Sequence, residues 1–114
     1  MDQKTFHILE FDKVLDRLAA YTSFSAGAQL ARGLTPTDEI DEARRRQAET
    51  AEAVDLFESG SDVTIGGARD VRRAVENARR GYVLRPEDFL EIRGTLIAAR
   101  NLRRALLKVE SRFP

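Results

Sequence analysis

Apolar residues recur at steps of three and four along most of this chain, a spacing that is typical of amphipathic helices. Near the start, the residues in this register are Ile8, Phe11, Val14, Leu15 and Leu18. They predict a buried stripe on a helix over about residues 4–20. The helix could instead break at the Glu10-Phe11-Asp12 step, in which case Asp12 would cap its second segment.

Two shorter signals follow this first helical region. Ser23 or Ser25 offers a side-chain oxygen for an N-cap, and small and apolar residues continue through Ala31. Thr35-Pro36 then disfavours helix, because the residue before a proline is pushed toward extended backbone. The pattern predicts a short helix and a turn.

A long helix is predicted to begin at Thr37 or Asp38 and to end at Gly60. Acidic residues crowd its first turns, where the helix dipole favours negative charge. Its expected inner stripe consists of Ile40, Ala43, Gln47, Ala51, Val54 and Phe57. Residues 63–67 follow as an apolar-centred loop or a short extended segment, for which the chain offers no partner strand.

Two further helices are predicted in the C-terminal half. Valines and alanines mark one over about 68–80, and Gly81 ends it because glycine tolerates the left-handed conformation. Pro86, followed by acidic residues, marks the start of the last helix, which extends to about residue 110. Its wide apolar stripe contains Phe89, Leu90, Ile92, Leu96, Ile97, Ala99, Leu102, Leu106, Leu107 and Val109. Such a width predicts contacts with more than one neighbour, including sequence outside these 114 residues.

Together these elements predict an all-α fold, a fragment of a helical bundle that residues 1–114 form as a single module ending in a long helix. The composition, with 42% hydrophobic and 33% charged residues, is that of a folded domain rather than a disordered chain. The absence of cysteine excludes disulfides and fits a cytoplasmic location. No signal peptide and no membrane span is expected from the sequence, and no membrane partner.

Charge is balanced overall but unevenly distributed along the chain. Residues 1–68 hold 7 basic and 13 acidic side chains, whereas residues 69–114 hold 12 basic and 6 acidic ones. Two interpretations follow: the two halves attract each other across a helical bundle, or the basic half forms a face for nucleic acid. The first interpretation is the simpler one.

No catalytic residue, cofactor-binding residue or metal ligand is predicted in this chain. His7 is the only histidine, whereas a zinc site needs three or four convergent ligands, and Gly66-Gly67 lacks the flanking residues of a phosphate-binding loop. Arginine clusters, including one at 44–46, are the better functional candidates, because guanidinium groups bind phosphates in a bidentate manner. The candidates for nucleic-acid contact are Arg72, Arg73, Arg79, Arg80, Arg100, Arg103, Arg104 and Lys108.

Several short motifs, in their order and spacing, resemble the N-terminus of the MutS type II family. The first of them are Leu9-Glu10-Phe11-Asp12-Lys13-Val14-Leu15, Ser25-Ala26-Gly27-Ala28 and Leu34-Thr35-Pro36. The later ones are Gln47-Ala48-Glu49-Thr50-Ala51-Glu52-Ala53, Ile65-Gly66-Gly67-Ala68-Arg69-Asp70-Val71 and Gly81-Tyr82-Val83-Leu84. Arg85 departs from the family pattern, since a small capping residue is more usual at that position.

The resemblance implies that the chain is the start of a helical core that connects lever or clamp helices to a C-terminal ATPase. Proteins of this family are homodimers that use ATP and Mg²⁺, often carry an Smr endonuclease domain, and act on branched DNA to suppress recombination or on stalled ribosomes. The ATPase and nuclease domains are expected in the parent protein, outside this chain. The alternative is a helical self-association or protein-interaction scaffold without direct nucleic-acid contact.

Overall fold

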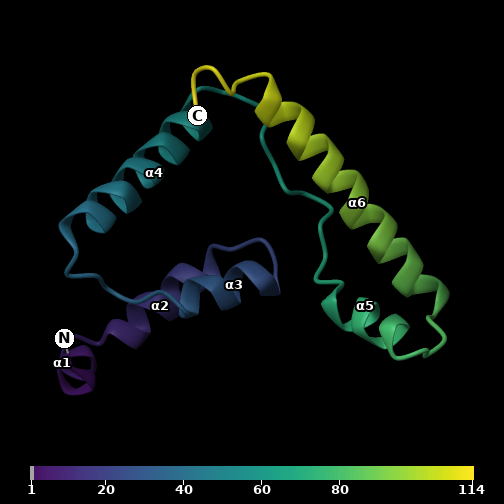
Figure 1. Ribbon diagram of the computed structural model, residues 1–114, viewed down its shortest axis with the longest axis horizontal. Coiled ribbons are helices and arrows are strands. Elements are labelled where there is room, and N and C mark those ends of the chain that lie inside the picture. The colour runs from purple at the N-terminus through teal and green to yellow at the C-terminus, as the bar shows by residue number, and fades with distance from the viewer. Residues whose placement is uncertain (1) are drawn as a thin grey trace.

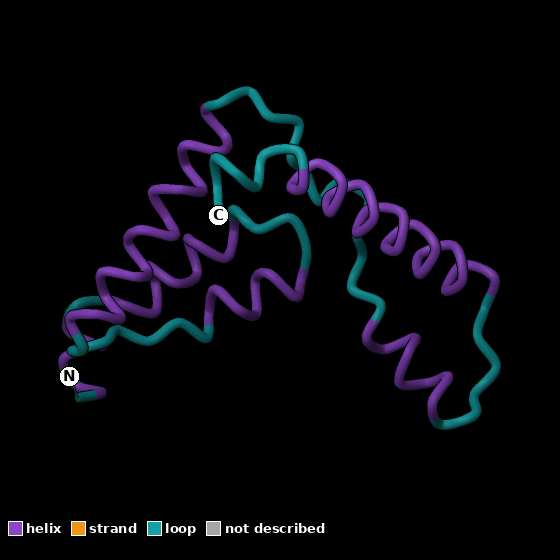
Figure 2. Tube along the Cα trace, turned by 45° about the horizontal axis from the view of Figure 1, so that its top comes forward, coloured by secondary structure: helices purple, strands orange, loops and turns teal. Residues whose placement is uncertain are grey.

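The computed structural model describes residues 2–114, which form helices joined by loops. The helices are α1 (Gln3–Ile8), α2 (Phe11–Ala20), α3 (Ser25–Arg32), α4 (Ile40–Glu58), α5 (Arg72–Arg79) and α6 (Pro86–Leu107), as Figure 1 shows. No strand occurs among the described residues (Figure 2). The predicted all-α fold ending in a long helix is therefore confirmed.

The first helical region is broken rather than continuous. Glu10 occupies the N-cap position of α2 and has a left-handed backbone with φ of 53°, so the chain turns there. Asp12 lies in the first turn of α2, and its predicted role as the cap is wrong. The rings of Phe6 and Phe11 stack across the break with centroids 5.4 Å apart. This contact links α1 to α2.

α3 begins without the serine cap that its sequence predicts. Phe24 is the N-cap residue, and no side chain caps the helix. The Ser25 hydroxyl instead donates to Asp70, 2.5 Å away in the segment before α5. α3 packs back against α2, and Ala19 and Ala31 are buried in these two helices. Their small side chains allow the two helices to approach closely.

The ends of α4 and α5 are set by glycines, as the sequence predicts. Gly60 and Gly81 have φ of 72° and 82°, in the left-handed region. After α5, the amide of Gly81 donates to the Ala78 carbonyl and that of Tyr82 to the Asn77 carbonyl, each at 3.0 Å. These two bonds form a Schellman motif, which satisfies carbonyls that the helix end leaves open.

α5 begins at Arg72, four residues later than predicted. The segment before it lies beside α6 and is bonded to it, because the amide of Arg69 donates to Thr95 Oγ1 at 3.0 Å and that hydroxyl donates back to the Arg69 carbonyl at 3.3 Å. Gly94 faces the same segment, and a Cβ there would lie 3.5 Å from the Gly67 carbonyl oxygen. Bonds to α6 thus replace the helical bonds that residues 68–71 would otherwise make.

α6 begins at Pro86, as predicted, and ends at Leu107 rather than near residue 110. The unusual Arg85 is accommodated by Asp88, since the Arg85 amide donates to the Asp88 carboxylate at 2.9 Å and the Asp88 amide donates to the Arg85 carbonyl at 3.0 Å. The N-terminal end of α6 is therefore capped from within the helix. None of the described helices combines the length and apolar character needed to cross a bilayer.

The molecule is open rather than compact. α4 and α6 converge at their C-terminal ends and diverge below, with the N-terminal helices and α5 at the two far ends (Figure 1). The Cα radius of gyration is 17.8 Å, whereas a compact chain of this length has about 13 Å. Ala19, Ala31 and Ala98 are the buried apolar residues among those described.

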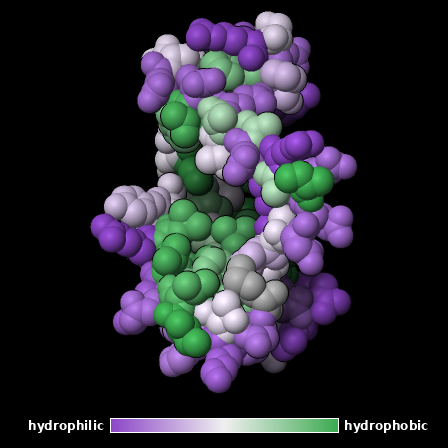
Figure 3. All heavy atoms as spheres, turned by 90° about the vertical axis from the view of Figure 1, so that its left-hand side faces the viewer, coloured by the Kyte–Doolittle hydropathy of each residue, from purple (hydrophilic) through white to green (hydrophobic). Residues whose placement is uncertain are grey.

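The stripes of α4 and α6 that were predicted to face inward are largely open to solvent. Ile40, Phe57 and Leu96 are 62%, 69% and 66% exposed. Figure 3 views the molecule from the side of the N-terminal helices and α4, where apolar side chains also gather in a surface patch bordered by polar ones. Soluble domains seldom leave so many large apolar side chains exposed, so these faces are free to contact other polypeptide.

Candidate nucleic-acid interface

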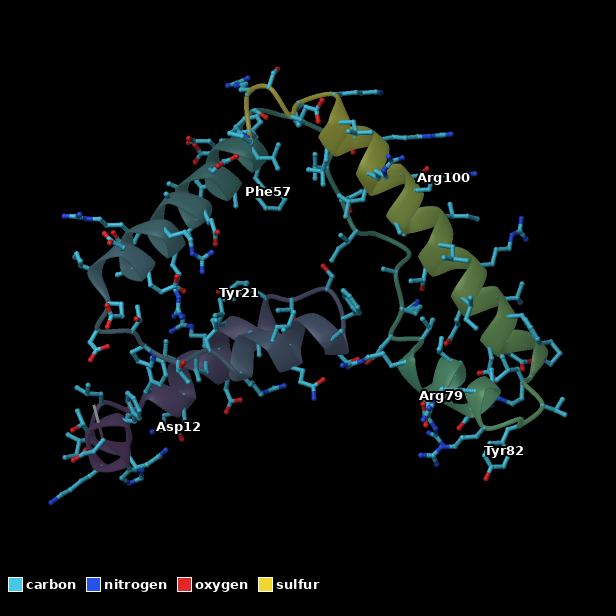
Figure 4. The ribbon with its side chains drawn as sticks, viewed as in Figure 1. Asp12, Tyr21, Phe57, Arg79, Tyr82 and Arg100 are labelled. Carbon is cyan, nitrogen blue, oxygen red and sulfur yellow. The ribbon has the colours of Figure 1, made fainter. Side chains whose placement is uncertain are left out.

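The eight basic residues predicted to contact nucleic acid divide between two helices. On and directly after α5 lie Arg72, Arg73, Arg79 and Arg80. On and directly after α6 lie Arg100, Arg103, Arg104 and Lys108. In Figure 4, Arg79 and Arg100 lie on different parts of the molecule, and Arg100 points outward from α6. The structure therefore presents two groups rather than one continuous basic surface.

Arg72 belongs to a network that joins α5 to α3. Its guanidinium donates to the Asp70 carboxylate at 2.6 and 2.9 Å and to Gln29 Oε1 at 2.8 Å. Ser25 donates to the same carboxylate. Hydrogen bonds from Arg72 and then Ser25 hold the pKa of Asp70 well below its ordinary value of 3.8. Arg72 is thus committed to contacts inside the chain.

Arg79 and Arg80 share one carboxylate, that of Glu76. Their Nε atoms lie 2.9 and 2.8 Å from its oxygens, at the i,i+3 and i,i+4 spacings of a helix surface. Hydrogen bonds from Arg79 and then Arg80 lower the pKa of Glu76, and the bond to Glu76 raises the pKa of Arg79. Their positive charges are therefore partly neutralised locally.

The arginine cluster of α4 is also paired within its own helix. Glu42 accepts from Arg45 at 2.8 Å and from Arg46 at 2.6 Å, and Arg46 also donates to the Thr35 carbonyl at 2.7 Å. Hydrogen bonds from Arg45 and then Arg46 lower the pKa of Glu42 from 4.5 to about 2. These contacts fasten the start of α4 and occupy the guanidinium groups.

The basic residues of α6 have no such partners. Among residues 2–114, no carboxylate forms an ion pair with Arg100, Arg103, Arg104 or Lys108, and all four are exposed. The sequence has no acidic residue between Glu91 and Glu110. Their guanidinium and ammonium groups are therefore available to an external anion.

Arg93 is a further basic residue of this group, and reasoning from arginine clusters missed it. It is exposed on α6 and forms no ion pair with any described residue. The signal that could have found it is helical spacing, because positions 93, 100, 104 and 108 follow steps of seven, four and four. These steps place all four side chains on one side of a helix.

The structure also bears on metal and catalytic chemistry. In the described part of the chain, no three histidine, aspartate or glutamate side chains gather as they would around a metal ion. His7 is exposed on α1.

Where α4 and α6 converge, a groove is lined by Leu56, Leu102 and Leu106, with Glu52 and Arg103 beside them. Its mainly apolar lining suits packing of polypeptide better than acid–base chemistry.

The chain is similar along its length to curated bacterial proteins. It is 40% identical over 110 residues to Endonuclease MutS2 of Symbiobacterium thermophilum, covering 96% of this chain and 14% of that protein. It is 37% identical over 117 residues to Endonuclease MutS2 of Thermomicrobium roseum, covering 100% and 15%, and 32% identical over 114 residues to that of Pelotomaculum thermopropionicum, covering 100% and 14%. The chain thus spans about a seventh of the length of the relatives it matches. No protein-family model and no solved structure matches.

Proposed function

Because the chain is a segment of the MutS type II family, we propose that it serves as a non-catalytic helical core module of a larger ATPase and endonuclease. In this proposal the parent protein binds ATP and Mg²⁺, forms a homodimer, and acts on branched DNA to suppress recombination or on stalled ribosomes. The ATPase residues, and the Smr domain where one is present, belong to the remainder of the parent. The name Endonuclease MutS2 of the relatives supports a nuclease parent. A cytoplasmic location is part of the proposal, since a chain without cysteine suits a reducing compartment.

The observation that carries this proposal is the exposed apolar surface of α4 and α6. Val54 and Phe57 on α4 are 48% and 69% exposed, and Leu96 on α6 is 66% exposed. Such faces become stable when other helices of the parent cover them. α6 is 22 residues long, or about 33 Å. A rigid element of that length, packed on the ATPase side and on the nucleic-acid side, would transmit nucleotide-driven motion between them.

The test uses the full-length protein with Leu96→Asp. Because Leu96 is exposed in the chain itself, this change should alter the stability of the segment by no more than about 0.5 kcal/mol. In the full-length protein it should bury a charge against the covering helices, and stimulation of ATP hydrolysis by branched DNA or ribosomes should fall severalfold. Ser111→Asp, which places the same carboxylate in an exposed turn after α6, is the matched control. Unchanged stimulation in a folded Leu96→Asp protein would count against the proposal.

A second candidate function is self-association through the same apolar face. Phe89, Leu90 and Leu96 are each at least 60% exposed on α6, which favours an interface between copies. The mass of the chain should then rise with concentration in sedimentation experiments. Charges placed at Leu96 and Leu102 should abolish that rise. A monomer at every concentration would exclude this candidate.

A further inference from the structure

Two stretches of the sequence carry charges of a single sign. Residues 92–109 contain five basic residues and no acidic one, whereas residues 47–68 contain five acidic residues and no basic one. The two stretches do not neutralise each other, since no ion pair among the described residues joins them. The positive charges of residues 93–108 are therefore not neutralised by ion pairs with the described residues.

Four of these basic residues form a line along one side of α6. We define the α6 basic row as Arg93, Arg100, Arg104 and Lys108, all of which are exposed. At 3.6 residues per turn and 1.5 Å per residue, they lie within about 80° around the helix axis and span about 22 Å along it. The arrangement gathers four cations on one side of the helix, where the exposed side chains of Leu96 and Ile97 lie beside Arg93 and Arg100.

The opposite side of α6 is already occupied. Thr95 is bonded to Arg69 there, Gly94 lies near Gly67, and Ala98 is the buried residue of this helix. Helical geometry places Thr95 and Ala98 more than about 100° from the middle of the row. The segment before α5 therefore contacts the side of α6 opposite the row. The row itself faces outward, as Arg100 does in Figure 4.

We propose that the α6 basic row binds the phosphodiester backbone of a nucleic-acid duplex. Duplex DNA carries about one negative charge per 1.7 Å of its axis, so a row of about 22 Å meets more phosphates than it has cations. Guanidinium groups without internal partners can donate two hydrogen bonds to a phosphate. Contacts of this kind position a protein on a duplex without reading its sequence.

An acidic helix, such as α4 of a second copy, matches the row less well. Glu49, Glu52, Asp55 and Glu58 follow one another at steps of three residues, which spreads them over about 180° of the α4 surface. In addition, Glu49 is already paired with Arg45. Phosphates line every side of a duplex, whereas these carboxylates face different directions.

This inference deepens the proposed function and rests on it, because it names the surface and the chemical group through which the segment would meet its nucleic acid. The phosphodiester can be that of DNA or of ribosomal RNA. In this proposal the row contacts phosphate groups only, and DNA and ribosomal RNA share those groups.

The experiment measures binding of the 114-residue chain to a short fluorescent DNA duplex and to an RNA duplex of equal length, by anisotropy. Salt is raised from about 50 to about 200 mM, and the logarithm of the association constant is plotted against that of the salt concentration. Four phosphate contacts on DNA predict a slope of about −3.6, at about 0.9 per contact. Tighter binding of one duplex would identify the source, and each duplex that gives the steep slope supports the row.

The decisive variant is R93Q/R100Q/R104Q, compared with R44Q/R79Q/R80Q, which removes the same net charge from arginines that are ion-paired in the structure. The row variant should make the DNA slope shallower by about 2.7 and weaken binding at low salt by about tenfold or more. The control should keep most of the slope. Circular dichroism checks that both variants keep the helix content of the wild type.

Equal losses in both variants, or no loss in the row variant, would overturn the inference. So would a row variant that keeps duplex binding and loses concentration-dependent self-association, because the row would then be a protein interface.

Measurements on the full-length protein distinguish failure of this inference from failure of the proposed function. Here the apolar face is probed on α4 by Phe57→Asp, because a carboxylate at position 96 would pair with Arg93 and Arg100 of the row. If the row variant binds duplex normally while Phe57→Asp uncouples ATP hydrolysis, the inference fails and the proposed function stands. If the row variant loses binding while Phe57→Asp has no effect, the proposed function fails instead.

Discussion

At the scale of single residues, a few carboxylates determine which arginines form ion pairs inside the chain and which stay available to an external anion. Glu42 holds two arginines of α4, Glu76 holds two of α5, and Asp70 holds Arg72. The acid-free stretch 92–109 has no residue that could play this part. The distribution of acids, more than the number of arginines, therefore distinguishes α6 from the other helices.

Glu42 gives this pairing a pH dependence that can be measured. Its pKa in the folded chain is about 2, below the ordinary 4.5, so its contribution to stability is complete above about pH 4.5 and is lost as the pH falls toward 2. Glu42→Gln should remove this part of the acid-induced loss of helix content, measured by circular dichroism. Added salt should weaken the effect in the wild type, because the pair is exposed.

Glu58→Gln is the matched control for that titration. Glu58 lies at the end of the same helix and forms no ion pair with any residue from 2 to 114. The Glu58→Gln variant should lose helix content with falling pH in nearly the same way as the wild type. Identical acid curves for the wild type and Glu42→Gln would show that the pairing does not stabilise α4.

Sequence spacing predicts part of this residue-scale picture. The pairs that Glu76 makes with Arg79 and Arg80 follow from steps of three and four along one helix. The bond from Ser25 to Asp70 does not, because 45 positions separate the two residues and only the fold brings them together. For the same reason the eight basic candidates could not be sorted from sequence into those that form ion pairs and those that do not.

At the scale of elements, boundaries were predicted well where local chemistry sets them. Pro86, Gly60 and Gly81 mark helix ends in the sequence and in the structure. The break at Glu10, which the sequence left as an alternative to a continuous helix, is decided by a left-handed non-glycine residue. The start of α5 was predicted four residues too early, because bonds to Thr95 decide it. At the start of α5, a contact between residues 26 positions apart thus overrides local propensity.

Two glycines allow a paired test of this element-scale reasoning. Gly81→Ala should destabilise the chain by about 1 kcal/mol, because its φ of 82° is strained for any residue with a Cβ. Gly94→Ala should stabilise it by up to about 1 kcal/mol, because alanine is the better helix former and its Cβ would make an ordinary contact 3.5 Å from Gly67. Thermal unfolding followed by circular dichroism measures both. Shifts of the same sign would contradict the assignment of these two backbone conformations.

At the scale of the whole molecule, the open shape is the feature that periodicity could not predict. The apolar faces of α4 and α6 were identified, but the pattern does not say what covers them. The relatives are about seven times longer than this chain, so the covering surface has ample sequence from which to come. In the proposed function, these exposed stripes are the faces that the rest of the parent protein covers.

We call the N-terminal helices α1–α3 one arm and the C-terminal helices α5 and α6 the other, and their arrangement should depend on the network around Asp70. Its carboxylate accepts from Ser25 of α3 and from Arg72 of α5, and Arg72 also reaches Gln29, so this network connects the N-terminal helices to the C-terminal half. Asp70→Ala removes the shared acceptor and should let the arms separate. We expect a radius of gyration in small-angle X-ray scattering that is larger than that of the wild type, while helix content stays the same.

Glu76→Ala is the control for this change, because it deletes two ion pairs on α5 that connect no other element. It should leave the scattering curve unaltered. Scattering that is unchanged in Asp70→Ala would mean that apolar packing alone fixes the arms, and an equal expansion in both variants would mean that general loss of charge pairing is responsible. Expansion confined to Asp70→Ala would make this network the connection through which motion of one arm reaches the other.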